Sequence, residues 1–260
     1  MHPEFSVHFI TLGCPKNEVD SDRMSAALAV SSGYGVSSDL ESADIAVLNT
    51  CAFITEAVEE AIAAIIELGA WKAARPGRFV IVAGCLPSRY GKTVEPELPE
   101  VDAFVPVADE ASLGRIIAGL TGRTADVTPP RLRTVPGPTA YLQVSDGCHR
   151  RCAYCTIPAI RGPYQSTPLE DIVEEARFLV ENGAKELVLI GQDISAYGRD
   201  LSSGDHLPAV LRALVALPGD FRLRLMYVQP DGITDELLSV MAGSEKICRY
   251  LDMPLQHASR

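Results

Sequence analysis

The sequence has no apolar run near the roughly 18 residues that a membrane-spanning helix needs. Its N-terminus, MHPEFSVHFITLGCPKNEVD, also lacks the basic segment and long apolar block of a secretory signal. No association with a membrane is therefore expected, and the predicted location is cytoplasmic. Because disulfides are rare in that compartment, the seven cysteines are expected to include metal ligands or catalytic thiols.

Positive charge is also scarce, since 23 basic against 34 acidic residues give a formal net charge of −11. A nucleic-acid-binding surface needs clustered positive charge, so nucleic acid is not expected to bind through this segment. The 260 residues, 47% of them hydrophobic, are typical of a globular protein with two modest domains or one barrel.

Strand and helix signals alternate along residues 1–125. Short apolar strands are expected at 5–11, 44–50, 78–84 and 103–107, and helices at 18–30, 54–74 and 109–120. Short strands separated by helices predict an open, mostly parallel α/β sheet for this N-terminal domain.

Residues 126–139 are rich in Pro, Gly and Thr and are predicted to be a linker, after which 140–260 form a second domain. Strands are expected at 140–145, 185–191, 221–228 and 247–253, and helices at 167–184, 207–217 and 234–243. Thr167 is the expected N-cap of the first of these helices, with Gly183 as its stop. Repeated βα units predict a barrel, and four units leave it incomplete.

Three cysteines fall within eight residues of the segment SDGCHRRCAYCTIPAIRG. Cys148, Cys152 and Cys155, spaced C-x3-C-x2-C, follow directly on a predicted strand, where α/β active sites gather. Structural zinc uses four ligands, and His149 is too close to Cys148 to be the fourth without straining the loop. A 4Fe–4S cluster on three thiolates leaves one iron open to another ligand, so the spacing favours such a cluster over three unrelated buried thiols.

Three further cysteines each follow a predicted strand, in FITLGC, VLNTC and VIVAGC. Cys14, Cys51 and Cys85 are expected two to four residues past the strand ends. Because the carboxyl ends of parallel strands meet at one edge, these thiols are predicted to form a second three-thiol site. The alternative for each is a small core residue, which is the expectation for Cys248 inside its strand.

A family resemblance follows from these motifs. The C-x3-C-x2-C spacing with an aromatic residue, Tyr154, before its last cysteine resembles the radical S-adenosylmethionine signature, and the three spread cysteines resemble the N-terminal domain of methylthiotransferases. The segments LGCPKNEVDSDRM, ELVLIGQDISAYGRDL, PDGITDELL and YLDMPLQHAS resemble the RimO-like branch, which modifies an aspartate of a small-subunit ribosomal protein. The alternatives are the tRNA-adenosine (MiaB-like) branch, which usually has Gln-Met-Asn after the first cysteine, and a non-catalytic iron–sulfur protein.

The resemblance implies an enzyme with two 4Fe–4S clusters and S-adenosyl-L-methionine as cofactors. One cluster would bind S-adenosylmethionine, and the other would carry the sulfur of a methylthio group destined for the aspartate β-carbon. The implied ligand sets are Cys148, Cys152 and Cys155 for the first cluster and Cys14, Cys51 and Cys85 for the second. The implied partners are the ribosomal protein and an electron donor of the flavodoxin or ferredoxin type.

The resemblance also implies roles for several other residues. Gln192 is expected to contact the methionine moiety of the cofactor and Tyr154 its adenine. Arg161 would shape the pocket or pair with a carboxylate, and Asn17 and Asp20 would cap a helix. Family members continue past the present C-terminus with the remaining barrel strands and a TRAM domain, so this chain is expected to be a fragment with impaired activity.

Overall fold

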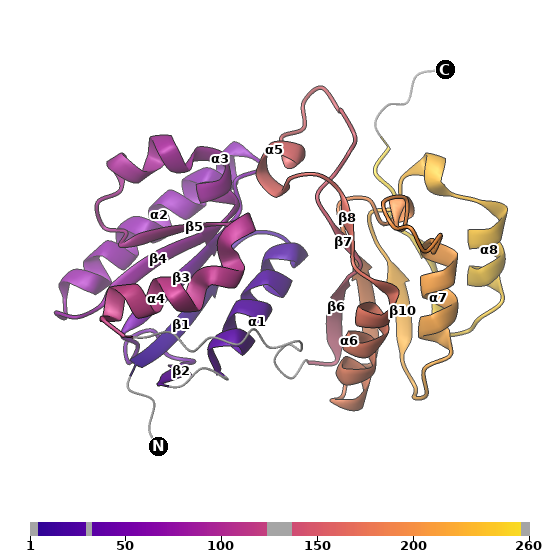
Figure 1. Cartoon of the computed structure of the whole chain (residues 1–260), viewed down its shortest axis with the longest axis horizontal. Helices are drawn as coiled ribbons and strands as arrows, with labels where there is room; N and C mark the ends of the chain where they lie inside the picture. The colour runs from indigo at the N-terminus through magenta and orange to yellow at the C-terminus, as the bar shows by residue number, and fades with distance from the viewer. Residues whose placement is uncertain (1–4, 30–32, 124–136, 256–260) are drawn as a thin grey trace. The chain divides into compact units, whose positions relative to one another are not determined.

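The computed structural model describes residues 5–29, 33–123 and 137–255, which form two units (Figure 1). The first unit comprises the described residues up to 123 together with Ala159–Arg161, and the second comprises the rest. The predicted linker, 126–139, lies largely outside the described residues. Within the described ranges, every helix is too short or too polar to span a membrane.

The first unit is built on a five-stranded sheet in the order β2-β1-β3-β4-β5, with every pairing parallel. Its strands are β1 (Phe5–Thr11), β2 (Tyr34–Val36), β3 (Ile45–Thr50), β4 (Phe79–Gly84) and β5 (Ala103–Pro106). Its helices are α1 (Pro15–Ala29), α2 (Thr55–Ala73), α3 (Cys85–Val94) and α4 (Leu113–Thr121), with 3-10 turns η1 (Glu95–Glu97) and η2 (Val107–Ser112). The strand order reverses between β1 and β3, and ligands of such sheets bind at that point, beyond the carboxyl ends of the strands.

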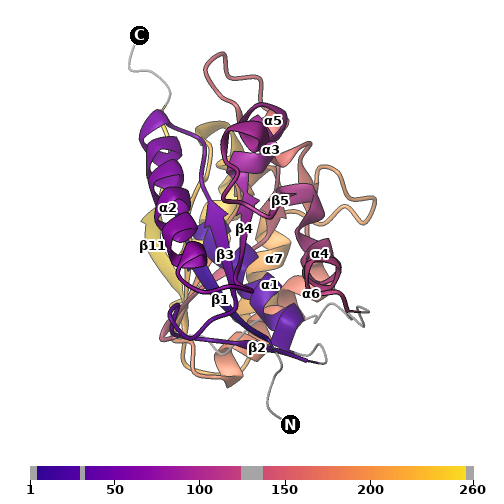
Figure 2. The ribbon, with the colours of Figure 1, turned by 90° about the vertical axis from the view of Figure 1, so that its left-hand side faces the viewer.

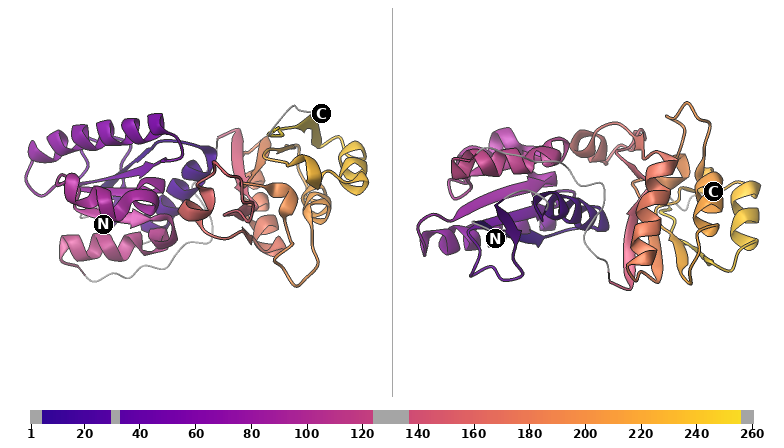
Figure 3. Two further views of the ribbon diagram at one scale, coloured as in Figure 1. Left: turned by 90° about the horizontal axis from the view of Figure 1, so that it is seen from above. Right: turned by 60° about the horizontal axis from the view of Figure 1, so that its bottom comes forward.

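Helices cover both faces of this sheet, as Figures 2 and 3 show. α1 and α4 pack on one face through Met24, Leu28 and Ile117, and α2 and α3 pack on the other through Ile65 and Leu86. Because both faces are covered, every residue of β3 is buried, which explains why its sequence is a continuous apolar run rather than an alternating one.

The second unit is built on a four-stranded parallel sheet in the order β11-β10-β9-β6. Its strands are β6 (Thr139–Gln143), β9 (Glu186–Ile190), β10 (Arg222–Leu225) and β11 (Ile247–Leu251), and its helices are α6 (Leu169–Glu181), α7 (Leu207–Val215) and α8 (Asp235–Ala242). Its smaller elements are β7 (Ser145–Asp146), β8 (Gln165–Ser166), η3 (Ile194–Ala196) and η4 (Pro230–Gly232). The short helix α5 (Ile157–Arg161) is divided, since its residues Ala159–Arg161 belong to the first unit. Spatial order follows chain order, as expected for part of a barrel.

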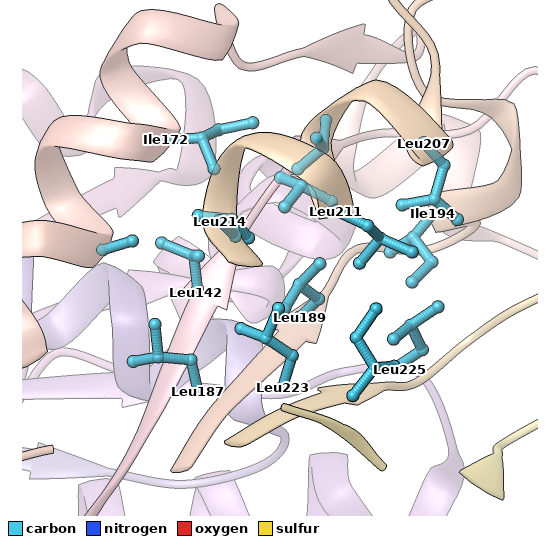
Figure 4. Close-up of a cluster of buried hydrophobic side chains, with 14 of the residues drawn as sticks. Leu142, Ile172, Leu187, Leu189, Ile194, Leu207, Leu211, Leu214, Leu223 and Leu225 are labelled. Atoms are coloured by element: carbon cyan, nitrogen blue, oxygen red, sulfur yellow. The ribbon is translucent and has the colours of Figure 1, made fainter. Parts of the chain in front are cut away.

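The core of the second unit lies between its sheet and its helices. Leu142, Leu189 and Leu223 from the strands meet Ile172 and Leu214 from the helices, and all five side chains are buried (Figure 4). The two parallel α/β units confirm the fold class expected from the alternation of strands and helices.

Several local expectations were wrong. Thr167 is not the N-cap of α6: Pro168 holds that position, and the Thr167 hydroxyl donates to the carbonyl of Gln143 at 3.3 Å. The helix expected at 109–120 is divided, with η2 preceding α4. α3 and β2 were not anticipated, because Pro87 and Gly91 weaken the helical pattern of α3 and β2 has only three residues.

Candidate functional site

Three cysteine-bearing segments meet at the carboxyl edge of the first sheet. Cys14 follows β1 after a short turn, whereas Cys51 directly follows β3 and Cys85 is the first residue of α3, so the expected spacing of two to four residues holds only for Cys14. These three strands are neighbours. Gly13 has a φ of +106°, and a Cβ there would lie 2.5 Å from the Cβ of Cys51. Glycine therefore lets the Cys14 turn approach the Cys51 segment closely.

A buried polar network joins the three segments. The Asn17 side chain is fully buried, and its Oδ1 accepts from the backbone N–H of Cys14 at 3.3 Å and from its thiol at 3.2 Å. Its Nδ2 donates to Asn49 Oδ1 and to the Thr50 carbonyl, each at 3.1 Å. The Thr50 hydroxyl donates to the Ala83 carbonyl at 2.7 Å and accepts from the N–H of Leu86 at 3.2 Å. Asn17 and Asp20 lie inside α1, so the expectation that they cap this helix was wrong. Asn17 instead fixes the Cys14 turn against the end of β3.

An ion pair lies beside the Cys85 thiol in the same unit. Arg161 Nη2 donates to Asp20 Oδ2 at 2.7 Å, and the two side chains are 1% and 8% exposed. Burial raises the pKa of Cys85 to about 11, the charge and hydrogen bond of Arg161 oppose that rise, and the Cys51 and Cys14 thiols add to it. Arg161 therefore pairs with a carboxylate, as one of its two expected roles required, and it favours the thiolate that a metal needs.

The second unit carries its three cysteines on one loop whose base is closed. β7 and β8 pair antiparallel on either side of the loop, and the N–H of Cys148 donates to the Gly162 carbonyl at 3.3 Å. Gly147, with a φ of +69°, would place a Cβ 2.1 Å from the Pro163 carbonyl oxygen. Inside the loop, the N–H of Cys155 donates to the Cys152 carbonyl at 3.1 Å.

Polar side chains from neighbouring strand ends reach this loop. Gln192, just past β9, donates through Nε2 to Asp146 Oδ1 at 2.9 Å, and its own Oε1 is buried without a hydrogen-bond partner. Burial raises the pKa of Cys148; the backbone N–H of Arg150 lowers it, and Asp193 adds to the rise. Tyr154 is 69% exposed.

Across the described residues, no group of three or more His, Cys, Asp or Glu side chains is arranged tightly enough to hold a metal ion. In the first unit the Cys85 thiol interacts electrostatically with Cys51 and Cys14, and in the second unit Cys148 interacts in this way with Cys155. Three thiols at one sheet edge and three on one loop are the donor type and number that a 4Fe–4S cluster with one open iron takes. The residues present therefore fit two such clusters in donor chemistry.

Comparison with known proteins shows which families and relatives the chain resembles. A model described as "Uncharacterized protein family UPF0004" matches residues 6–106, and that of the radical SAM superfamily matches 142–260. The ribosomal protein uS12 methylthiotransferase RimO of Syntrophus aciditrophicus (strain SB) is 45% identical over 269 residues, covering 98% of this chain and 59% of that protein. Its namesake in Geotalea uraniireducens (strain Rf4) is 43% identical over 265 residues, covering 97% and 59%. Over nearly its whole length, the chain is similar to RimO-like methylthiotransferases.

The chain spans about three fifths of the length of the curated relatives it matches. Similarity to the radical SAM superfamily and to these relatives implies 4Fe–4S clusters and S-adenosylmethionine as cofactors. Among solved structures, the radical S-adenosylmethionine methyltransferase TsrM from Kitasatospora setae, with cobalamin and a [4Fe-4S] cluster bound, matches with a TM-score of 0.70. That match covers 98% of this chain and 62% of TsrM at 15% identity, so it supports the fold alone.

The sequence patterns predicted no role for several residues that hold the cysteine-bearing loops in place. Asn49, Thr50, Asp193 and Tyr164 had no assigned role, although each lies at or near a strand end or in the cluster-loop hairpin. Tyr164 is 4% exposed and donates to the Asp193 carbonyl at 3.1 Å, and burial raises its pKa to about 12. For Asn49 and Thr50 the available signal was their place at the end of β3, directly before Cys51.

Proposed function

We propose that this chain carries the two cluster sites of an enzyme that inserts a methylthio group at the β-carbon of an aspartate in ribosomal protein uS12. The observation that carries the proposal is the presence of two separate three-thiol sets, one at the carboxyl edge of each unit's sheet. Three thiols per set leave one iron of a 4Fe–4S cluster without a protein ligand. Relatives named as uS12 methylthiotransferases, 45% and 43% identical, support the substrate.

The proposed ligands divide by unit. Cys14, Cys51 and Cys85 hold the cluster of the first unit, and Cys148, Cys152 and Cys155 hold that of the second. When bound there, a second-unit cluster would supply the electron for cleavage of the sulfonium bond of S-adenosylmethionine, and a first-unit cluster would supply sulfur for the substrate. The chain's own residues do the positioning: Asn17 fixes the Cys14 turn, Arg161 favours the Cys85 thiolate, and the β7–β8 hairpin closes the other loop.

Two residues are proposed to bind S-adenosylmethionine. Gln192 Oε1 is a buried acceptor without a partner, and the methionine moiety carries an amino group that can donate to it. The exposed ring of Tyr154, directly before Cys155, offers a surface on which adenine can stack. Gln192→Leu should therefore weaken cofactor binding while leaving the iron content unchanged.

The proposed partners are protein rather than nucleic acid. The formal charge of −11 suits a basic ribosomal protein better than the phosphate backbone of a tRNA. A flavodoxin- or ferredoxin-type donor is the expected source of electrons, and we propose the cytoplasm as the location.

The test is an anaerobic incubation of the reconstituted chain with reductant, S-adenosylmethionine, sulfide and purified uS12, followed by mass spectrometry. A methylthio group replacing a hydrogen on one aspartate of uS12 is the expected product. Modification of an adenosine in a parallel incubation that contains tRNA in place of uS12, with uS12 itself unchanged, would contradict the proposed substrate.

A further inference from the structure

Arg150 lies inside the cysteine loop of the second unit, yet its side chain leaves that loop. Its Nε donates to Asp193 Oδ2 at 2.7 Å. Its Nη2 and Nη1 donate to the two carboxylate oxygens of Asp231 at 2.7 and 3.1 Å. Asp193 follows β9 and Asp231 lies in η4 after β10. One guanidinium therefore ties the loop to the ends of two neighbouring strands.

The carboxylate of Asp193 is itself held firmly. Its side chain is 3% exposed, and its Oδ1 accepts from the N–H and the hydroxyl of Ser195. Gly232 of η4 lies against the same serine, because a Cβ at Gly232 would come within 2.2 Å of the Ser195 hydroxyl. The Arg150 side chain thus meets a rigid acceptor, and a planar guanidinium with several donors matches two carboxylates as a single ammonium does not.

The charges of Arg150, Asp193 and Asp231 indicate that Arg150 holds the loop in place rather than supplying positive charge to a cluster. One guanidinium with two carboxylates leaves a net charge of −1, so the group brings no surplus positive charge to an anionic cluster. The side-chain hydrogen bonds of Arg150 lower the pKa of Asp231, which keeps that partner ionised. Residues that orient metal ligands from outside typically change metal affinity 10–100-fold when they are lost.

We propose that Arg150 is a positioning residue, which holds Cys148 and Cys152 at a fixed place in the loop by clamping it to Asp193 and Asp231. The inference rests on the proposed function, since the ligands it positions are those assigned to the second-unit cluster. Residue type matters: the fork of Arg150 spans both carboxylates, so Arg150→Lys should not restore the clamp.

The experiment uses the full chain in a Cys14→Ala, Cys51→Ala, Cys85→Ala background, so that iron reports only the second-unit loop. Arg150→Gln, Arg150→Lys and Asp231→Asn are compared with Arg151→Gln, which removes the same charge from the adjacent exposed residue. After anaerobic reconstitution, the rate of iron loss to a chelator and the electron paramagnetic resonance signal of the reduced cluster, with and without S-adenosylmethionine, are recorded. Iron loss should accelerate 10–100-fold in both Arg150 variants and less in Asp231→Asn, with Arg151→Gln unchanged.

Hydrogen exchange of residues 147–155 in the metal-free chain tests the clamp without a cluster. Faster exchange in Arg150→Gln and Arg150→Lys, but not in Arg151→Gln, is the expected result. Equal exchange and equal iron loss in Arg150→Gln and Arg151→Gln would overturn the clamp, and full rescue by lysine would show that charge alone suffices and overturn it too. A parent chain that takes up no iron would refute the proposed function, whereas the exchange rates would still decide the clamp.

Discussion

Asn17→Ala should destabilise the first unit by about 3 kcal/mol. The side chain is fully buried and donates two hydrogen bonds, to Asn49 Oδ1 and the Thr50 carbonyl, while its own oxygen accepts from Cys14. Each lost bond costs about 1 kcal/mol, and a buried acceptor left without a donor costs about 1–3 kcal/mol more. Truncation strands Asn49 Oδ1 inside the unit, at a cost of about 1 kcal/mol or more. With about 1 kcal/mol for each of the two donated bonds the sum is about 3 kcal/mol, because the partly exposed Cys14 groups can bond to water instead.

The assay is urea unfolding of the metal-free chain, followed by tryptophan fluorescence. Trp71 is the single tryptophan of the chain and is 7% exposed in α2, so it reports on the first unit. Asn182→Ala is the matched control, since this exposed side chain makes one hydrogen bond, to the Phe178 carbonyl in the second unit. The control should leave the Trp71 transition unchanged. A loss below about 1 kcal/mol in Asn17→Ala would refute the account of the network.

Three further predictions concern the two cysteine sites. Asp20→Asn leaves the Arg161 guanidinium buried without its carboxylate, so the free energy of unfolding in urea should fall by about 3–5 kcal/mol. The double variant Asp20→Leu, Arg161→Met should recover most of that stability. Equal losses in the single and the double variant would contradict a buried ion pair. In the metal-free chain, the rate at which iodoacetamide alkylates the Cys85 thiol should keep rising with pH up to about 11, because burial raises the pKa of this thiol and only the thiolate reacts. A rate that levels off near pH 9 would contradict this. Gly147→Ala should reduce the iron held by the second-unit loop, whereas Gly204→Ala, also at positive φ but with nothing within 4 Å of its Cβ, should not; equal iron in both would show that the contact with Pro163 is unimportant.

The sequence predicted the two parallel sheets well because its strands are short apolar runs at regular spacing. The short apolar run of β3 and the regular alternation of strands and helices in the second unit are local signals. α3 was not predicted because it begins directly at Cys85 and contains Pro87 and Gly91, which have low helix propensity. The packing of Leu86 in the core of the first unit outweighs those propensities.

The candidate sites were predictable only in part. Strand ends carrying cysteines predicted where the thiols gather, but not which polar groups hold them. The bond from Asn17 to Asn49 joins residues 32 apart, and that from Arg150 to Asp231 joins residues 81 apart. Such pairings depend on how parallel strands bring distant segments to one edge, and no local pattern encodes them. The prediction that Thr167 caps its helix was wrong for a similar reason, because the Thr167 hydroxyl donates to the distant Gln143 carbonyl.

The most direct test of the central claim is the iron and sulfide content per chain after anaerobic reconstitution. Three chains should be compared: the parent chain and two triple variants. One variant carries Cys148→Ala, Cys152→Ala and Cys155→Ala together, and the other carries Cys14→Ala, Cys51→Ala and Cys85→Ala together. Two 4Fe–4S clusters predict about eight irons in the parent chain and about four in either triple variant. About four irons in the parent chain, falling to none when the second-unit cysteines are removed, would contradict the account, because the first-unit thiols would then hold no cluster.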